Sequence, residues 1–127
     1  MKTCLLVDDS RVIRKVARQI LENLGFSCAD AEDGQQALDA CKKSMPDIVL
    51  LDWNMPVMTG IDFLGHLRIL PGGDIPHVIF CTTENDATHI REALSKGANE
   101  YIMKPFDADI IRNKLEQVGL YSSPENT

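Results

Sequence analysis

The sequence predicts an α/β fold: a five-stranded parallel sheet with five helices wound over both of its faces. Three short, unbroken apolar runs, at residues 3–7, 48–51 and 78–81, are typical of strands buried on both sides of a sheet. Segments with helical periodicity separate these runs, so strands and helices alternate along the chain. Such alternation favours parallel strands joined by right-handed crossovers.

The clearest helix is predicted at residues 11–24, where apolar residues recur with the period of an α-helix. Gly25 follows directly, in the position that glycine favours after a helix. The predicted apolar stripe consists of Val12, Ile13, Val16, Ala17, Ile20, Leu21 and Leu24.

Residues 27–31 can form a second strand, and another helix follows it. Asp33 is placed to cap the free N–H groups at the start of this helix, and Gln36 can reach back to the backbone. The helix is expected to run to about residue 44, because Pro46 cannot continue it.

The second half of the chain predicts three further strands, each followed by a helix. Proline and glycine residues predict turns at 53–60 and 71–74, and Gly97 is expected to end a helix. The whole is expected to form one domain over residues 1–120, with a short C-terminal tail at 121–127. The predicted elements are a strand at 48–51, a helix at 61–68, a strand at 78–82, a helix at 86–96, a strand at 101–103 and a helix at 107–118.

The charge of the chain argues against two classes of partner. Its 127 residues include 13 Lys and Arg against 19 Asp and Glu, a net charge of -6. Because phosphate groups are bound by clustered cations, we expect no unaided binding to nucleic acid or to anionic membranes. No apolar run approaches the roughly 18 residues that span a bilayer, and no signal-peptide core is present, so we expect a cytoplasmic protein.

The four cysteines are scattered along the chain and form no C-x-x-C pair. No histidine lies at the spacing of a zinc site. We therefore expect Cys4, Cys28, Cys41 and Cys81 to be reduced residues of the core.

Polar residues follow four of the five predicted strands. Asp8 and Asp9 end the first strand, Asp52 the third, Thr82 the fourth and Lys104 the fifth. In open parallel sheets ligands bind at the carboxyl ends of the strands, so these side chains are expected to share one crevice. The second strand ends in nothing comparable, which is consistent with its lying at an edge of the sheet.

Three carboxylates in one crevice repel one another. Each pair at 4 Å costs about 1 kcal/mol in water and about 4 kcal/mol at an effective dielectric constant of 20. Lys104 and a divalent cation would together neutralise the three charges, and an all-oxygen ligand set favours Mg²⁺ over Zn²⁺. In such a pocket Asp52 is a candidate nucleophile toward a phosphoryl group, with Thr82 as a hydroxyl donor and Lys104 as a phosphate-binding cation.

These landmarks resemble the receiver domain of two-component response regulators, and most of all its CheY-like, single-domain type. The resemblance extends over residues 2–120 and implies a flavodoxin-like sheet in the order 2-1-3-4-5. It rests on features that follow one another in the sequence at the ends of predicted strands: Asp8-Asp9, Asp52-Trp53-Asn54-Met55-Pro56, Thr82 and Lys104-Pro105-Phe106.

By the same resemblance, Asp52 accepts a phosphoryl group from the phosphohistidine of a histidine kinase. The resemblance implies that Asp9 and Asp52 bind Mg²⁺ directly, together with the backbone carbonyl of Asn54. Asp8 is expected to act on the ion largely through water.

Further residues acquire roles only from the resemblance. Thr82 and Tyr101 would form the switch pair that responds to phosphorylation, and Asn54 and Glu84 would tune the lifetime of the aspartyl phosphate. In relatives the peptide bond before Pro105 is cis, whereas only about 5% of such bonds are cis in folded proteins.

Two residues depart from the pattern of the relatives. Thr59 stands where relatives often have Asp, and it can cap the following helix by itself. Thr83 replaces a residue that is often Ala, and its greater bulk is expected to restrict the access of phosphodonors or phosphatases.

The resulting hypothesis is a stand-alone response regulator: not an enzyme, although it catalyses its own phosphorylation and dephosphorylation. We expect a monomer that signals by protein contact through the surface of the fourth helix, fifth strand and fifth helix. The downstream protein is not identified by the sequence. Exposed candidates on that surface are His89, Arg91, Glu92 and Lys114.

Three alternatives remain open at this stage. A Mg²⁺-dependent aspartyl-phosphate phosphatase would need a second acid two residues after the nucleophile, where this chain has Asn54. An FMN carrier of the same topology would need hydroxyl and N–H donors in its first loop, where Asp8 and Asp9 would repel the ligand phosphate. A degenerate receiver that serves only as a docking surface would not need the acceptor, Thr and Lys positions.

Overall fold

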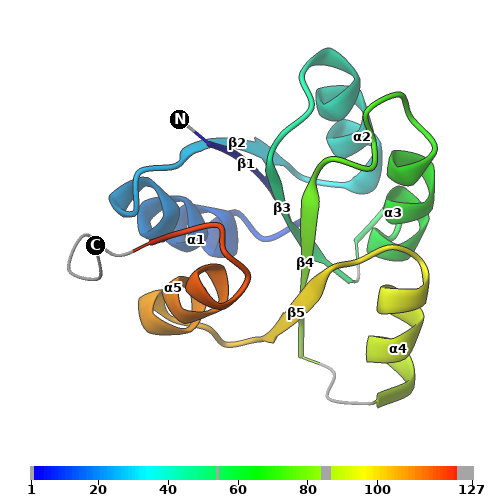
Figure 1. Ribbon diagram of the computed structural model, residues 1–127. Helices are drawn as coiled ribbons and strands as arrows, with labels where there is room; N and C mark the ends of the chain where they lie inside the picture. Colours follow the sequence, from blue (N-terminus) through cyan, green and yellow to red (C-terminus); the bar gives the residue numbers. More distant parts are fainter. Residues whose placement is uncertain (1, 54, 84–86, 123–127) are drawn as a thin grey trace.

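The computed structural model describes residues 2–53, 55–83 and 87–122, and it confirms the predicted doubly wound α/β fold (Figure 1). All strand pairs are parallel, in the order β2-β1-β3-β4-β5, so β2 lies at one edge of the sheet. The strands are β1 (Thr3–Val7), β2 (Ser27–Ala31), β3 (Ile48–Asp52), β4 (His77–Thr82) and β5 (Glu100–Met103). The helices are α1 (Arg11–Asn23), α2 (Gly34–Lys43), α3 (Gly60–Arg68), α4 (Ala87–Ser95) and α5 (Ala108–Gln117).

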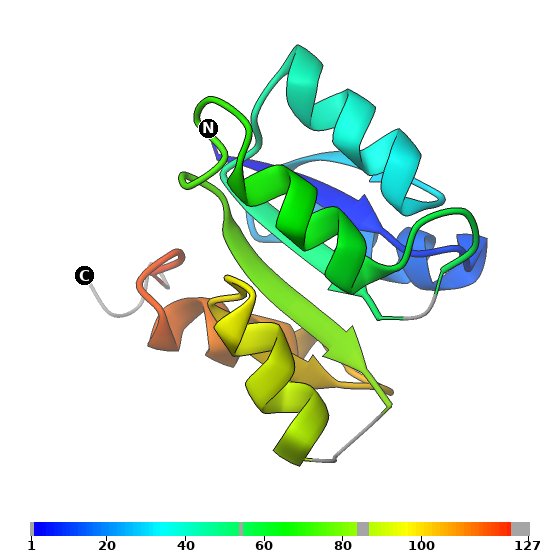
Figure 2. The same ribbon diagram turned by 90° about the vertical axis from the view of Figure 1, so that its right-hand side faces the viewer.

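The helices cover the sheet in two layers. α1 and α5 lie on one face, and α2, α3 and α4 lie on the other (Figures 1 and 2). Because successive side chains of a strand point to opposite faces, β1 contributes to both layers. Leu5 and Val7 pack with α2 and α3, whereas Cys4 and Leu6 pack with α1 and α5. This burial on both sides explains the unbroken apolar runs of the central strands.

Side-chain oxygens cap the starts of four helices. Each accepts a hydrogen bond from the backbone N–H group three residues later, as an N-cap does. At α2 the predicted cap by Asp33 is confirmed, and Gln36 reaches back to the backbone N–H of Glu32, 2.9 Å away. The capping residues are Ser10, Asp33, Thr59 and Asp107.

The predicted apolar stripe of the first helix was wrong in part. Val12 is 70% exposed and Val16 is 43% exposed, so neither belongs to the buried face. The buried residues of α1 are Arg14, Ala17 and Leu21. Arg14 and Ala17 are three positions apart, and Ala17 and Leu21 are four apart. All three therefore lie on one side of the helix, which is the side turned toward the sheet.

The end of the described chain packs against the layer of α1 and α5. Leu120 and Tyr121 join that core cluster, and both of their backbone N–H groups donate to the carbonyl of Leu115. The rest of the predicted tail, residues 123–127, lies outside the described residues.

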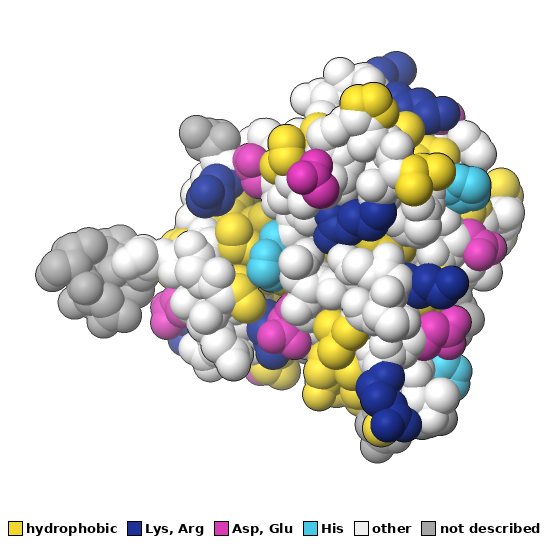
Figure 3. All heavy atoms as spheres, turned by 45° about the vertical axis from the view of Figure 1, so that its right-hand side comes forward, with side chains coloured by type: hydrophobic (Ala, Val, Ile, Leu, Met, Phe, Trp, Pro, Cys, Tyr) yellow, Lys and Arg dark blue, Asp and Glu magenta, His cyan; other side chains and the backbone are white. Residues whose placement is uncertain are grey.

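Among the helices described here, none is both long and apolar enough to cross a bilayer. On the face shown in Figure 3, acidic and basic side chains are interspersed with small groups of apolar ones.

Candidate functional site

The carboxyl ends of four strands bring the predicted polar residues to one edge of the sheet. Val7 of β1 is paired with Leu51 of β3, so Asp8 and Asp52 follow at the same level on neighbouring strands. On the other side of β3, Thr82 ends β4, and it is paired with Met103 directly before Lys104. The short parallel strands therefore turn residues far apart in sequence into neighbours.

Three carboxylates converge at this edge. Asp8, Asp9 and Asp52 each offer an oxygen atom, and these atoms all lie within 4.8 Å of one another. Asp8 is buried, Asp52 is half-buried and Asp9 is exposed, so the cluster extends from the interior of the protein to its surface. At such distances the three negative charges repel strongly unless a cation lies among them.

Lys104 supplies one positive charge to the cluster. Its Nζ atom lies 2.8 Å from Asp8 Oδ2 and 3.1 Å from Asp52 Oδ1, and so bridges two of the three carboxylates. Although burial opposes its charged form, the hydrogen bond to Asp8 and the negative charge of Asp52 raise the pKa of Lys104 above its ordinary value. The ammonium group is therefore held in its charged form.

The charges around Asp52 remain predominantly negative although Lys104 is close to it. Burial and then the charge of Asp8 raise its pKa above the ordinary value of an aspartate, and the attraction of Lys104 only partly opposes them. One ammonium group does not balance three carboxylates. A further cation at this edge would lower the free energy of the ionised cluster.

The donor set fits Mg²⁺. All three candidate ligands are carboxylates, they are close enough to share one ion, and no described histidine or cysteine joins the group. Asn54, whose backbone carbonyl is the predicted further ligand, lies outside the described residues.

Arg14 belongs to the site although the sequence reasoning missed it. Its Nη1 atom donates to the backbone carbonyl of Asp8 at 2.7 Å, and its Nε atom donates to Asp30 Oδ2 at 3.2 Å. The backbone N–H of Ser10 donates to Asp8 Oδ1 at 2.9 Å, so both the backbone and the carboxylate of Asp8 are fixed. The signal was available: Arg14 lies on the same helix face as Ala17 and Leu21.

Trp53 directly follows the candidate acceptor Asp52, and its ring packs against β4 and α4. Its ring centroid lies 5.1 Å from that of Phe80 on β4 and 5.2 Å from that of His89 on α4, the latter in an edge-on arrangement. His89 is therefore half-buried against Trp53 and less exposed than the sequence predicted.

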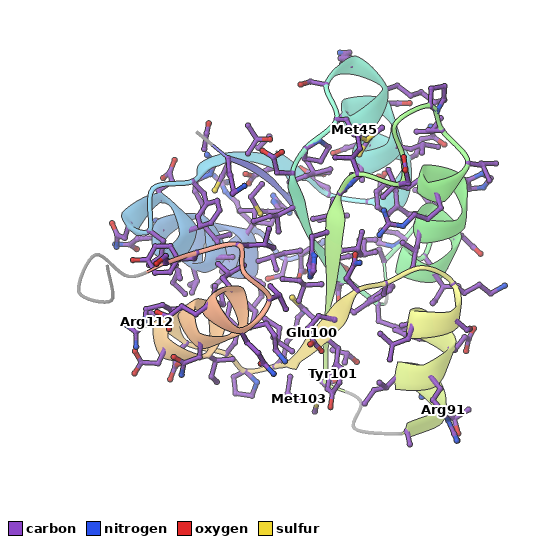
Figure 4. The ribbon with its side chains drawn as sticks, viewed as in Figure 1. Met45, Arg91, Glu100, Tyr101, Met103 and Arg112 are labelled. Atoms are coloured by element: carbon purple, nitrogen blue, oxygen red, sulfur yellow. The ribbon has the colours of Figure 1, made fainter. Side chains whose placement is uncertain are left out.

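The predicted switch residues lie on neighbouring strands. Thr82 is buried at the end of β4, and Tyr101 is half-buried on β5, which runs between α4 and α5 (Figure 4). The Nζ atom of Lys114 lies 5.7 Å from the centre of the Tyr101 ring and 3.4 Å from Glu100, so Lys114 is also less exposed than predicted. Arg91 and Glu92 of α4 are exposed, as predicted.

Glu84 lies outside the described residues. The peptide bond between Lys104 and Pro105, whose isomer the sequence left open, is cis.

Comparisons with known proteins find similar sequences over nearly the whole chain. The family model of the response regulator receiver domain matches residues 4–116. Chemotaxis protein CheY-3 of Vibrio cholerae is 39% identical over 117 residues, which are 90% of this chain and 88% of that protein. Chemotaxis protein CheY of Pseudomonas aeruginosa is 37% identical over 115 residues, covering 90% of this chain and 93% of that protein.

Solved structures give the same result. The chemotaxis response regulator CheY4 of Vibrio cholerae superposes with a TM-score of 0.88 at 32% identity, over 93% of this chain and 98% of that one. The receiver domain of a Pseudomonas aeruginosa sensor histidine kinase superposes with a TM-score of 0.83 at 27% identity. The superposition covers 91% of this chain and 95% of that one. That structure has a magnesium ion coordinated in its active-site cleft. From the family match and the extent of these similarities, the chain belongs to the response regulator receiver domain family.

Proposed function

We propose that this receiver domain is a stand-alone response regulator in which Asp52 accepts a phosphoryl group from the phosphohistidine of a histidine kinase. The observation that carries the proposal is the bridge of Lys104 between Asp8 and Asp52 at the edge where three carboxylates meet. The match covers about nine tenths of the length of the chemotaxis relatives, 88% of one and 93% of another, so those proteins consist of little more than the matched domain.

In this proposal each residue of the edge has a distinct task. Asp52 attacks the phosphorus atom with a carboxylate oxygen, and the donor imidazole leaves with the electrons of the broken P–N bond. Lys104 stays within reach of the oxygens of Asp52 and is placed to bind the negative charge that arrives with the phosphoryl group. Thr82 offers a hydroxyl group from the neighbouring strand end.

Asp9 and Asp52 would hold Mg²⁺ directly and Asp8 through water, with Asn54 as the proposed backbone ligand. When bound, the ion supplies positive charge for the phosphoryl oxygens, as is common in phosphoryl transfer. The buried Arg14 keeps the backbone of Asp8 in place for this arrangement.

The readout would use the surface of α4, β5 and α5. Phosphorylation adds about -1.5 to -2 charges at the strand ends and can bias a two-state element by about 1 to 3 kcal/mol. Thr82 and Tyr101 are the proposed switch pair, and Asn54 and Glu84 are proposed to tune the lifetime of the phosphorylated state. The names of the chemotaxis relatives support a partner protein of chemotaxis-type signalling, and we propose that the receiver acts as a monomer.

The test is phosphorylation with a small-molecule donor. Incubation with Mg²⁺ and acetyl phosphate should add one labile phosphoryl group by intact mass and change the fluorescence of Trp53, the only tryptophan. Asp52→Asn should abolish both effects. Asp39→Asn, on the exposed side of α2, should retain both and serves as the matched control.

Other outcomes would favour the alternatives. A stable adduct on another residue would contradict the assignment of Asp52, and sustained hydrolysis of an external phosphomonoester would favour a phosphatase. Retention of FMN on purification would favour the carrier. Partner capture with and without beryllofluoride tests the readout, since a partner indifferent to this mimic would contradict phosphorylation-gated binding.

A further inference from the structure

Two of the four cysteines are direct neighbours in the sheet and take no part in the proposed phosphotransfer. Cys4 of β1 is paired in register with Cys28 of β2. Paired residues of parallel strands project to the same face of the sheet. Both thiols accordingly pack in the core cluster on the side of α1 and α5.

The spacing of this pair suits a disulfide. Neighbouring strands lie about 4.8 Å apart, and residues in register are separated by about that distance between Cα atoms. Disulfides join residues whose Cα atoms lie about 4.4 to 6.8 Å apart. Cys28 is also close enough to act on Cys4 electrostatically: after burial, it is the largest influence that raises the pKa of the Cys4 thiol.

The other two cysteines are excluded as partners. Cys41 of α2 packs in the core cluster on the opposite face of the sheet. Cys81 shares the face of Cys4 but lies on β4, and β3 separates that strand from β1. Two strand spacings, about 9.6 Å, exceed the reach of a disulfide.

The two thiols differ in access. Cys28 lies on the edge strand β2 and is partly exposed, whereas Cys4 is only 1% exposed. Burial raises the pKa of Cys28, and the nearby guanidinium of Arg18, which donates to the carbonyl of Cys28 at 3.0 Å, opposes that rise. A small oxidant would therefore meet Cys28 first.

We propose that Cys4 and Cys28 form an oxidisable dithiol that reacts with low-molecular-weight disulfides to give a bond between β1 and β2. In the first step the thiolate of Cys28 attacks the disulfide and releases one small thiolate. In the second step the thiolate of Cys4 attacks the Cys28 sulfur of the mixed disulfide and releases the other. Two protein thiols are oxidised, one external disulfide is reduced to two thiols, and each released thiolate takes up a proton from water.

This bond would fasten the edge strand covalently to the centre of the sheet. It would close a loop that contains all of α1, from β1 to β2. A cross-link of this kind restricts the unfolded chain, so the oxidised protein should unfold at a higher urea concentration than the reduced protein.

The test uses oxidised glutathione on the folded protein of 127 residues. After reaction at mildly alkaline pH, alkylation in denaturant should find two free thiols in place of the four of the reduced chain. The intact mass should be lower by two hydrogen atoms, with no retained glutathione, and peptide mapping should find Cys4 joined to Cys28. The Cys41→Ser variant is the matched control and should form the same bond.

Variants of the pair separate the two steps. Cys4→Ala and Cys4→Ser should both stop at a mixed disulfide between glutathione and Cys28, and Cys28→Ser should not react under the same conditions. Alanine is included because a buried serine at position 4 can itself impair folding. Retention of glutathione by the unmodified sequence, a disulfide-linked dimer, or a bond that includes Cys41 or Cys81 would overturn the proposal. None of these outcomes depends on phosphorylation of Asp52.

Discussion

At the scale of single residues, the charge of Asp52 is the feature that connects stability with function. The side chain is half-buried beside Asp8, and Lys104 is the cation that contacts both. A carboxylate in such surroundings opposes folding when it is ionised, since the unfolded chain exposes it to water. The same excess of negative charge is what attracts a divalent cation to the crevice.

Asp52→Asn should stabilise the protein near neutral pH in the absence of divalent cations. The folded pKa of Asp52 is raised above the ordinary aspartate value of about 3.9. As the pH rises from that value toward the raised folded pKa, the unfolded state loses its proton first, so stability falls through this window and remains lower above it. We expect the variant to gain about 1 kcal/mol at neutral pH and little below pH ~3.

Urea unfolding at several pH values measures this difference. Asp39→Asn on α2 is the control and should change the free energy of unfolding by less than about 0.5 kcal/mol at either pH. An Asp52→Asn variant that is less stable than the parent at neutral pH would contradict the electrostatic argument.

Val57→Asn should also stabilise the protein, for a backbone reason. Val57 has a φ of 69°, in the left-handed region, and its side chain is 82% exposed. A β-branched residue is strained there, whereas asparagine tolerates the conformation, so we expect a gain of about 1 kcal/mol by thermal or urea unfolding. Val12→Asn, at a 70% exposed position of α1, should give no such gain.

At the scale of elements, the site depends on how closely α3 approaches the end of β3. Gly60 is the first residue of α3, and its backbone N–H donates to the carbonyl of Trp53 at 3.1 Å. A Cβ atom at position 60 would overlap the backbone carbonyl of Asp52 and lie 2.9 Å from Phe80 Cε1. The absence of a side chain at this position therefore allows the helix to pack directly against the strand that carries the phosphoacceptor.

Gly60→Ala should destabilise the protein, and Gly65→Ala should do the reverse. The first change forces α3 away from β3, and we expect a loss of about 3 kcal/mol. Gly65 lies in the same helix with nothing within 4 Å of an added Cβ, so alanine there should gain about 0.5 to 1 kcal/mol from helix propensity alone. Comparable unfolding midpoints for the two variants would show that a Cβ atom at position 60 can be accommodated next to the backbone carbonyl of Asp52.

At the scale of the whole molecule, charge is distributed unevenly. The chain carries a net charge of -6, yet acidic and basic groups are interspersed over the face in Figure 3. At the carboxyl end of the sheet, oxygen atoms of three aspartates lie within 4.8 Å of one another. Because the fold holds these groups together only in the folded state, an ion that binds them stabilises the entire domain.

Mg²⁺ should therefore raise the free energy of unfolding. At a free concentration one hundred times the dissociation constant, the expected gain is about 2.7 kcal/mol, measured by urea unfolding with Mg²⁺ and with a chelator. Asp9→Asn should lose most of this gain while the chelated protein keeps nearly its original stability, because Asp9 is exposed. Equal unfolding curves with and without the ion would exclude a metal site at this edge.

Local sequence patterns were sufficient to predict the strands and helices and to name the candidate site residues. Apolar runs and helical periodicity predicted every strand and helix to within a few residues, and the caps at Asp33 and Thr59 follow from side-chain chemistry close in sequence. The order of polar residues at the strand ends suggested the acidic crevice, because all parallel strands end at the same edge. These features depend on neighbours along the chain, which a sequence displays directly.

The packing of elements against one another decided the rest. The face of α1 that is buried includes Arg14 in place of Val12 and Val16, because the helix turns this side toward the sheet to reach Asp8 and Asp30. The bridge of Lys104 between two carboxylates and the pairing of Cys4 with Cys28 arise from strand order and register. Such contacts join residues far apart in sequence, so their distances are fixed only when the layers pack together.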